Sequence, residues 1–255
     1  MQFSGRPNLS GQVAIITGGA RGIGQACAVA LAAEGADVVS ADLGPSPETV
    51  AQVTALGRRA LDVPTDVSRR EAVRLLVERV LAEFGRIDIL VNNAGTLARV
   101  GVEETTDELW DRDINTTLRG TFYCIQAVLP HMKARRSGKI VNISSVSGKI
   151  GGVASKAPGS SRGRSGPAYA AAKAGVLALI KWVAKDVGRD GIYVNAIAPG
   201  GVETEMTRGF DYGVDNIPIS RMGRPEDIAQ AVVFLASQMS NYITGAVIDV
   251  NGGIV

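Results

Sequence analysis

Short runs of apolar residues alternate with segments of helical character along nearly the whole chain. Strands that are apolar at almost every position are buried on both faces, and they occur in parallel sheets that crossover helices cover on both sides. Right-handed crossovers make a sheet of this kind doubly wound. The alternation therefore predicts an α/β fold. Residues 1–255 are expected to form one doubly wound domain, with a seven-stranded parallel sheet and helices on both faces.

The sequence also predicts where most of these elements lie. The strands with clear bounds are residues 12–17, 36–42, 87–91, 139–144, 192–197 and 246–250. The expected helices are residues 22–34, a helix that starts at 46–47, and residues 68–84, 105–132, 168–187 and 225–237. Three helix starts have a local signature, which is Pro47 at the first helical position and two capping boxes, Ser68 with Glu71 and Thr105 with Glu108.

Three stretches fall outside this alternation. Residues 1–10 predict an N-terminal tail, and residues 149–167 and 200–223 interrupt the rhythm of strands and helices. Ligands of open α/β sheets bind beyond the carboxyl ends of the strands. We therefore expect the two internal stretches to wall a ligand site, the first as an inserted loop and the second as a short substrate lid.

Charge and the rarer residue types argue against several classes of function. A net charge of +2 without a separate run of Lys and Arg argues against nucleic acid as a partner. No apolar stretch is long enough for a membrane span, and residues 1–11 lack the apolar core of a signal peptide. Two distant cysteines fit a reducing, cytoplasmic compartment. A single histidine argues against a metal site and against a histidine-based catalytic triad.

A glycine-rich loop, Thr17-Gly18-Gly19-Ala20-Arg21-Gly22-Ile23-Gly24, joins the first expected strand to the first expected helix. Glycines there let the backbone approach a pyrophosphate, which the free N–H groups at the helix start can bind. Asp42 ends the next strand, 18 residues after Gly24. A carboxylate there binds the ribose hydroxyls of NAD and repels the extra phosphate of NADP. Because Arg21 would partly offset this repulsion, we expect a preference for NAD rather than exclusion of NADP.

Four motifs, in this order along the chain, resemble those of the classical short-chain dehydrogenase/reductase family. They are the TGxxxGxG spacing of the loop, Asn92-Asn93-Ala94-Gly95, Tyr169-Ala170-Ala171-Ala172-Lys173 and Pro199-Gly200. The resemblance extends from about residue 9 to residue 253. It implies a Rossmann-type fold, hydride transfer between a nicotinamide cofactor and a small alcohol or carbonyl substrate, and a homotetramer.

The resemblance also assigns roles to individual residues. The implied catalytic residues are Asn115, Ser145, Tyr169 and Lys173. Together with Arg21 and Asp42, the implied cofactor-binding residues are Gly18, Gly22, Ile23, Gly24, Asp66, Val67, Asn93, Ala94, Gly95, Tyr169, Lys173, Pro199, Gly200, Val202 and Thr204.

Tyr169 and Lys173 lie four residues apart on an expected helix, so their side chains share one face. A nearby ammonium favours the phenolate, and we therefore expect Lys173 to lower the pKa of Tyr169. Tyr169 would exchange a proton with the substrate oxygen, and Ser145 would hold that oxygen by a hydrogen bond. By the resemblance, Asn115 would hold a water that links Lys173 to solvent.

The chain departs from the family pattern between the catalytic residues. Tyr169 follows Ser145 by 24 residues, about twice the usual gap, and the extra residues carry Lys149, Lys156, Arg162 and Arg164 without an acidic residue. We expect Ser147 and one or more of Lys156, Arg162 and Arg164 to contact the substrate, which would then be anionic. The alternative is a solvated flap whose charges only keep it soluble.

Three functions remain open. The leading one is an NAD(H)-dependent oxidoreductase that interconverts a secondary alcohol, or a sugar or polyol hydroxyl, and a carbonyl. The second is a 3-oxoacyl-[acyl-carrier-protein] reductase, in which Arg135, Arg136 and Lys139 would meet an acidic carrier, although Asp42 argues against NADPH. The third is a non-catalytic nucleotide-binding protein, because fold alone does not imply catalysis.

Overall fold

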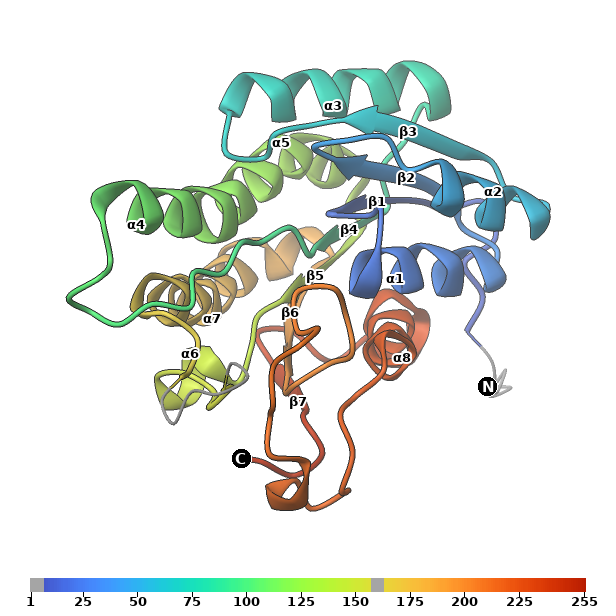
Figure 1. The fold of residues 1–255 in the computed structure, drawn as a ribbon. Helices are drawn as coiled ribbons and strands as arrows, with labels where there is room; N and C mark the ends of the chain where they lie inside the picture. Colours follow the sequence, from blue (N-terminus) through green and yellow to red (C-terminus); the bar gives the residue numbers. More distant parts are fainter. Residues whose placement is uncertain (1–6, 157–162) are drawn as a thin grey trace.

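The computed structural model describes residues 7–156 and 163–255, and its centre is a seven-stranded sheet (Figure 1). All neighbouring strands are parallel, in the order β3-β2-β1-β4-β5-β6-β7. The strands are β1 (Val13–Thr17), β2 (Asp37–Asp42), β3 (Ala60–Pro64), β4 (Ile89–Asn92), β5 (Gly138–Ile143), β6 (Ile192–Pro199) and β7 (Val247–Val250). The predicted doubly wound α/β fold is confirmed.

Strand β3 is the strand for which the sequence predicts no bounds. It lies at the edge of the sheet and pairs only with β2 in the sheet order. Its residues Ala60 to Val63 are half-buried and Pro64 is exposed. Because an edge strand is covered less than a central one, it need not be a continuous apolar run, and that run is the pattern that identifies the other six strands.

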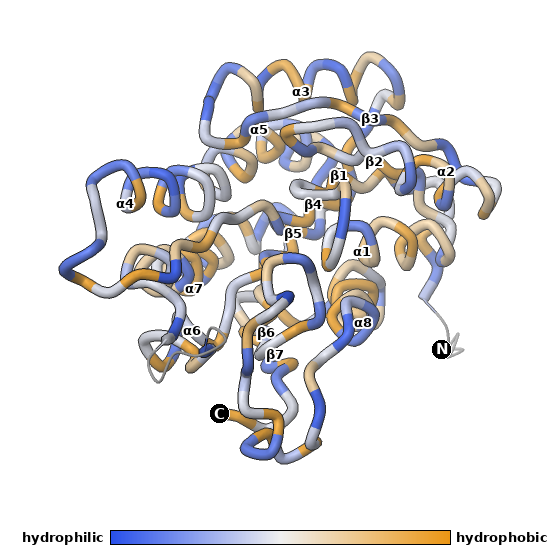
Figure 2. Tube along the Cα trace, viewed as in Figure 1, coloured by the Kyte–Doolittle hydropathy of each residue, from blue (hydrophilic) through white to orange (hydrophobic). Residues whose placement is uncertain are grey.

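Helices cover both faces of the sheet. They are α1 (Gly22–Ala33), α2 (Pro47–Ala55), α3 (Arg70–Phe84), α4 (Asp107–Ile114), α5 (Gly120–Arg135), α6 (Ser147–Ile150), α7 (Pro167–Val187) and α8 (Pro225–Ala236), with the shorter turns η1 (Asn115–Arg119), η2 (Gly188–Asp190), η3 (Val214–Asn216) and η4 (Gln238–Ser240). Figure 2 shows hydrophobic and hydrophilic positions alternating along α3, as expected for a helix with one face on the core.

Successive residues of each central strand enter different cores. Val13 and Ile15 of β1 pack in the core that α3, α5 and α7 cover. Ala14 and Ile16 pack in the core that α1, α2 and α8 cover. The side chains of a strand alternate between its two faces, so a strand between two helical layers is apolar at most of its positions.

The start of α2 at Pro47 is as predicted, but the start of α3 is not. Its N-cap is Arg69, and no side-chain hydrogen bond caps it, so the predicted box of Ser68 with Glu71 does not form. The hydroxyl and the N–H of Ser68 donate instead to the carboxylate of Asp66, at 2.6 and 2.9 Å. The Ser68 hydroxyl, which the prediction assigned to the cap, is thus hydrogen-bonded to a neighbouring side chain instead.

The second predicted capping box is also wrong, by one residue. Thr106, not Thr105, caps α4, and its hydroxyl accepts a hydrogen bond from the N–H of Leu109 at 3.3 Å. Thr105 donates to the carbonyl of Gly101 at 2.7 Å. The long helix expected over residues 105–132 is in fact three consecutive pieces, α4, the π-helical turn η1 and α5, which ends at Arg135.

The expected N-terminal tail is partly packed. Leu9 is fully buried in the core beneath α1 and α8, and its N–H donates to the carbonyl of Glu34 at 2.8 Å. Part of the predicted tail therefore belongs to the folded body. Within residues 7–156 and 163–255, no helix is both long enough and apolar enough to span a membrane.

The two irregular segments pack against each other. Ala154 pairs with Arg164 in an antiparallel bridge, and Lys156 pairs with Asp211 through two backbone hydrogen bonds of 2.8 Å. The first contact folds the inserted segment back on itself, and the second joins it to the stretch after β6. The two segments thus support each other.

Candidate active site

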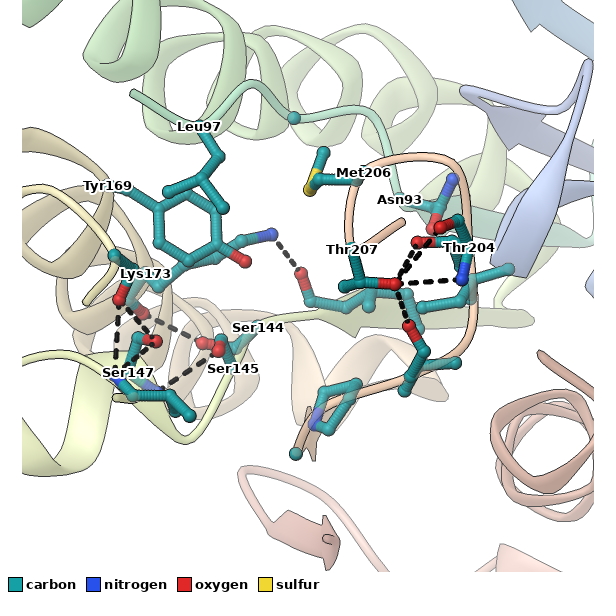
Figure 3. Close-up of a pocket in the computed structure, with 18 of the residues that line it drawn as sticks. Asn93, Leu97, Ser144, Ser145, Ser147, Tyr169, Lys173, Thr204, Met206 and Thr207 are labelled. Atoms are coloured by element: carbon teal, nitrogen blue, oxygen red, sulfur yellow. Dashed lines mark hydrogen bonds between the residues drawn. The ribbon is translucent and has the colours of Figure 1, made fainter. Parts of the chain in front are cut away.

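A pocket of about 120 Å³ opens beyond the carboxyl ends of β4, β5 and β6. This edge is where the chain reverses direction across the sheet, since β1 lies between β2 and β4. Ligands of doubly wound sheets bind at such a reversal. The lining residues that Figure 3 labels are Asn93, Leu97, Ser144, Ser145, Ser147, Tyr169, Lys173, Thr204, Met206 and Thr207.

Tyr169 and Ser145 meet at the centre of this pocket. Tyr169 lies in the first turn of α7, which Pro167 starts, and Ser145 follows the end of β5. A hydrogen bond joins the Tyr169 phenol to Ser145, whose hydroxyl also accepts from the N–H of Ser147 at 3.0 Å. The hydroxyl of Ser144 turns away and donates to the carbonyl of Lys173 at 2.8 Å. Ser145, rather than Ser144, is therefore the hydroxyl available to a ligand beside Tyr169.

Lys173 lies one helical turn below Tyr169 and is buried, with 4% of its surface exposed. Its ammonium donates to the carbonyl of Ile143 at 2.6 Å and lies 5.6 Å from the centre of the Tyr169 ring. Figure 3 shows both side chains directed into the pocket. The predicted shared helix face therefore places them together.

The pKa of Tyr169 does not follow the prediction. Burial raises the pKa of the Tyr169 phenol to about 12, and the hydrogen bond with Ser145 and the charge of Arg99 only partly oppose this rise. Burial also lowers the pKa of Lys173 to about 8, and its ammonium donates to a carbonyl rather than to the phenol. The expectation that Lys173 lowers the pKa of Tyr169 is wrong for the chain by itself. Near neutral pH the phenol is protonated and able to donate.

Asn115 starts the π-helical turn η1, which packs against α7. Its side-chain oxygen Oδ1 is buried and accepts no hydrogen bond from the residues that the structure describes. Gly95 makes the close packing here possible, because a Cβ on it would lie 3.2 Å from the Thr117 hydroxyl and 3.6 Å from the Lys173 ammonium. Turns of π-helix are rare in proteins overall, and those that occur are often found at functional sites.

The glycine-rich loop fits a bound pyrophosphate. Helix α1 follows Arg21, and no side chain caps its first turn, so the first N–H groups of the helix remain able to bind an anion. Gly24 allows the loop to fold tightly against the helix, because a Cβ there would overlap the carbonyl oxygen of Gly18. Gly18 itself has a φ of +64°, in the left-handed region that favours glycine.

Asn93 and Ala94 tie this loop to the end of β4. The side-chain amide of Asn93 donates to the carbonyls of Thr17 and Gly18, at 3.0 and 2.9 Å. The Thr17 hydroxyl accepts from the N–H groups of Asn93 and Ala94, at 3.0 and 3.1 Å. These bonds fix the glycine-rich loop against the end of β4, at the edge of the sheet where a dinucleotide would bind.

Asp42 ends β2 next to the glycine-rich loop. Its Oδ2 accepts from the N–H of Ala20 at 3.0 Å, and its Oδ1 accepts from the N–H of Leu43 at 2.7 Å. Arg21 forms an ion pair with Glu205 in the segment after β6. The guanidinium is thus already engaged by a carboxylate, which reduces the offset that the sequence predicts for Arg21.

Asp66 and Val67, which the resemblance assigns to cofactor binding, follow the end of β3. The Asp66 carboxylate holds Ser68, and the Val67 side chain is buried against Gly120, where a Cβ would approach it to 2.8 Å. The side chain of Val67 is therefore committed to the core. Only its backbone remains for a ligand.

The segment after β6 supplies the other wall of the pocket. Pro199, Gly200, Val202 and Thr204 all line it. Thr207, which the sequence analysis does not identify, fixes this turn, because its hydroxyl donates to the Val202 carbonyl at 2.6 Å and accepts from the N–H of Thr204 at 2.9 Å. A threonine three residues after another in an irregular segment is the only sequence signal for this role.

Of the predicted substrate residues that the structure describes, Ser147 lines the pocket and the basic ones do not. Ser147 lines the pocket, and its hydroxyl shares a hydrogen bond of 2.9 Å with that of Ser165. Lys156 and Arg164 do not line the pocket and are exposed, because the inserted segment folds back on itself with these side chains in solvent. Lys149 forms an ion pair with Asp249. Arg162 lies outside the described residues.

Besides Lys173, the cationic side chain that lines the pocket among the described residues is Arg99, which the sequence analysis does not identify. It follows β4 within the segment that begins at Asn93, at the same edge of the sheet as Ser145. The sequence signal for Arg99 was its position just beyond the end of a strand, where ligands of such sheets bind. The sequence analysis instead assigned substrate contact to the basic residues of the unusually long inserted segment.

Comparisons with known proteins agree with this geometry. Residues 18–255 match the family described as enoyl-(acyl carrier protein) reductase. The chain is 39% identical to the 3-oxoacyl-[acyl-carrier-protein] reductase FabG of Thermotoga maritima, over 97% of this chain and 99% of that protein. It is 38% identical to the 2-dehydro-3-deoxy-D-gluconate 5-dehydrogenase of Escherichia coli, over 96% of each chain.

A solved structure has the same fold over nearly the whole chain. It is named a putative 2-deoxy-d-gluconate 3-dehydrogenase from Agrobacterium tumefaciens and has NADP bound. It superposes on this chain with a TM-score of 0.85 and 35% sequence identity, over 97% of each chain. With the sequence match to residues 18–255, these similarities show that the chain belongs to the short-chain dehydrogenase/reductase family of oxidoreductases.

Proposed function

We propose that the protein is an NAD(H)-dependent oxidoreductase that interconverts a secondary alcohol, or a sugar or polyol hydroxyl, and the corresponding carbonyl. The observation that carries the proposal is the meeting of Ser145, Tyr169 and Lys173 in one pocket beside an uncapped helix start. The names of the Escherichia coli and Agrobacterium tumefaciens relatives, both dehydrogenases of sugar acids, favour a hydroxylated substrate.

The chemistry divides between the cofactor and the protein. Bound nicotinamide supplies or accepts the hydride. Tyr169 donates its proton to the carbonyl oxygen in reduction, and in oxidation it accepts the alcohol proton as the phenolate, after it has lost its own proton. Ser145 donates a hydrogen bond to the same oxygen and stabilises the charge that develops there. Lys173 holds a positive charge one helical turn away from the phenol.

Asn115 extends this site toward solvent in the proposal. Its buried Oδ1 has no protein donor among the described residues, so it is available to a water molecule. A water held there and in reach of Lys173 would return protons to Tyr169 after each turnover. Lys173 is suited to this exchange because burial lowers its pKa to about 8.

Asp42 is proposed to select NAD over NADP. Its carboxylate is fixed by the N–H groups of Ala20 and Leu43, and Arg21 is paired with Glu205 rather than free to bind a phosphate. We expect wild-type kcat/KM to be higher with NAD, and Asp42→Asn to lower the NAD/NADP ratio of kcat/KM about tenfold, because the repulsion of the 2′-phosphate disappears. Steady-state kinetics with both cofactors measures the ratio.

The control for this variant is Glu48→Gln, which removes an exposed negative charge from the first turn of α2. It should leave the ratio unchanged. Equal or better efficiency of the wild type with NADP would contradict the role of Asp42.

The second candidate function is reduction of a 3-oxoacyl thioester on an acyl carrier, which the name of the Thermotoga maritima relative favours. The docking surface considered from the sequence does not support it. Arg135 is paired with Asp88, and Lys139 donates to Ser240 and Asn241, at the amino end of β5. Six residues of extended chain, about 20 Å, separate this end from Ser145.

The two functions are separated by substrate. We expect the protein to oxidise members of a panel of secondary alcohols, sugars and polyols with NAD, with a higher kcat/KM than for NADPH-dependent reduction of a 3-oxoacyl thioester. The opposite order would favour the second candidate.

We also propose a symmetric homotetramer. Trp182 on α7, Phe122 on α5 and Trp110 on α4 are large apolar side chains that are 67, 38 and 42% exposed. Burying them against a second copy would remove this apolar surface from water. Light scattering at micromolar concentration should give a tetramer mass, and a monomer would contradict the proposal.

A further inference from the structure

The pocket carries a positive charge that the proposed reaction does not use. Of the described residues that line the pocket, the charged ones are Lys173 and Arg99, and both are cationic. Lys173 belongs to the catalytic group already described. Arg99 has no part in the proton transfer, yet its charge is close enough to lower the pKa of Tyr169.

Arg99 is held in place by neutral partners. Its guanidinium donates to the Ser155 hydroxyl, to the Met206 carbonyl at 3.1 Å and to the Tyr212 hydroxyl at 2.6 Å. It also lies over the ring of Phe210, 4.0 Å from the ring centre. These contacts fix the side chain without neutralising its charge.

No carboxylate within the described ranges forms an ion pair with Arg99. Asp113 is paired with Arg112, and Glu205 is paired with Arg21. Residues 1–6 and 157–162 contain no Asp or Glu in the sequence, so they cannot supply the missing carboxylate. A half-buried guanidinium without an anionic partner is unusual, because charges withdrawn from water are normally paired.

The backbone before Arg99 is fixed at both of its polar groups. The N–H of Ala98 donates to the buried carboxylate of Asp113 at 2.8 Å, and the carbonyl of Ala98 accepts from the N–H of Gly166 at 2.8 Å. Asp113 is on α4, and Gly166 immediately precedes α7, which carries Tyr169. Arg99 is therefore positioned relative to the catalytic helix before any ligand arrives.

The cluster can donate several hydrogen bonds to one anion. A guanidinium has five N–H groups, and the three named acceptors use three of them. Tyr212 lines the pocket and accepts from Arg99, so it keeps its own hydroxyl hydrogen for a ligand. A carboxylate would supply the charged acceptor that this cluster lacks.

We propose that Arg99, with Tyr212, binds a carboxylate of the substrate, so that the preferred substrates are hydroxy acids and their oxo forms rather than neutral alcohols. The inference rests on the proposed oxidoreductase function, whose substrate class it narrows. In this inference Arg99, which lines the pocket, has the anion-binding role that the sequence analysis assigned to the exposed Lys156 and Arg164.

The test compares acids with amides of nearly the same shape. The probes are 3-hydroxybutanoate and gluconate, each with its primary amide, assayed for NAD-dependent oxidation. We expect the wild type to prefer each acid, and Arg99→Gln to lower kcat/KM for the acid about 10- to 100-fold while changing that for the amide by less than about threefold. Arg99→Lys should retain part of the preference, because it keeps the charge.

Arg164→Gln is the matched control, since it removes the same charge from an exposed position outside the pocket. It should leave both substrates unaffected. Equal losses on acid and amide in Arg99→Gln, or no loss on the acid, would overturn the inference. Thermal unfolding identifies a variant that fails to fold, in which case Tyr212→Phe, which removes one hydroxyl, must still lower the preference for the acid.

Binding without turnover separates this inference from the proposed function. Butanoate and butanamide contain no hydroxyl, so their binding, measured by NMR titration of the protein with NADH, does not depend on catalysis. We expect the carboxylate to bind more tightly than the amide, and Arg99→Gln to remove the difference. An inactive wild type that still discriminates would refute the proposed reaction alone, whereas equal binding of both probes would refute the role of Arg99.

Discussion

Replacing Tyr169 with phenylalanine should lower kcat by about 10²- to 10⁴-fold, the range typical of a lost general acid or base. The variant keeps the ring that packs in the pocket and loses only the hydroxyl that meets Ser145. Cofactor binding should change little. Because burial raises the pKa of Tyr169 to about 12, the phenol carries its proton at neutral pH, and reduction should be the direction that depends on it directly.

Steady-state kinetics in both directions and equilibrium binding of NAD measure this effect. Tyr193→Phe is the control, because Tyr193 lies at the start of β6, under the ammonium of Lys139 and away from the pocket. Retention of more than about a tenth of wild-type kcat in Tyr169→Phe would exclude Tyr169 as the acid/base. Absence of turnover in the wild type itself would instead favour a non-catalytic nucleotide-binding role for the site.

Replacing Lys173 with methionine should lower kcat about 10²-fold or more and also weaken cofactor binding. Methionine has a similar length and suits a buried position, so the packing of α7 should persist. The variant removes the ammonium beside Tyr169 and its hydrogen bond to the Ile143 carbonyl. Kinetics, NAD titration and thermal unfolding separate the loss of function from a loss of folding.

Lys181→Met is the matched control, on the exposed side of the same helix. A double variant sharpens the test. If Lys173 acts on the rate through Tyr169, then Lys173→Met should cost little further kcat in a Tyr169→Phe background and should still weaken NAD binding. Full additivity of the two rate effects would mean that Lys173 acts independently of the tyrosine.

The central strands and the glycine-rich loop were predictable because their signals are local. A strand between two helical layers is buried on both faces, and β1 and β4 are apolar at every position except the last, Thr17 and Asn92. Edge strand β3 does not show this pattern because four of its residues are only partly buried and the last is exposed. The capping boxes of α3 and α4 were misplaced because neighbouring hydroxyls and carboxylates compete for the same donors.

The candidate site likewise has features that local sequence encodes and features that only tertiary packing decides. The sequence by itself determined the fold class, the glycine-rich loop and the pair Tyr169 and Lys173, because each depends on residues that are neighbours along the chain or one helical turn apart. Only the tertiary structure decided the protonation of Tyr169, which burial controls. It also decided the Arg99 cluster, whose partners Ser155 and Tyr212 lie 56 and 113 residues away along the chain. Contacts of that kind depend on how the walls of the pocket pack against each other, and no local pattern encodes that packing.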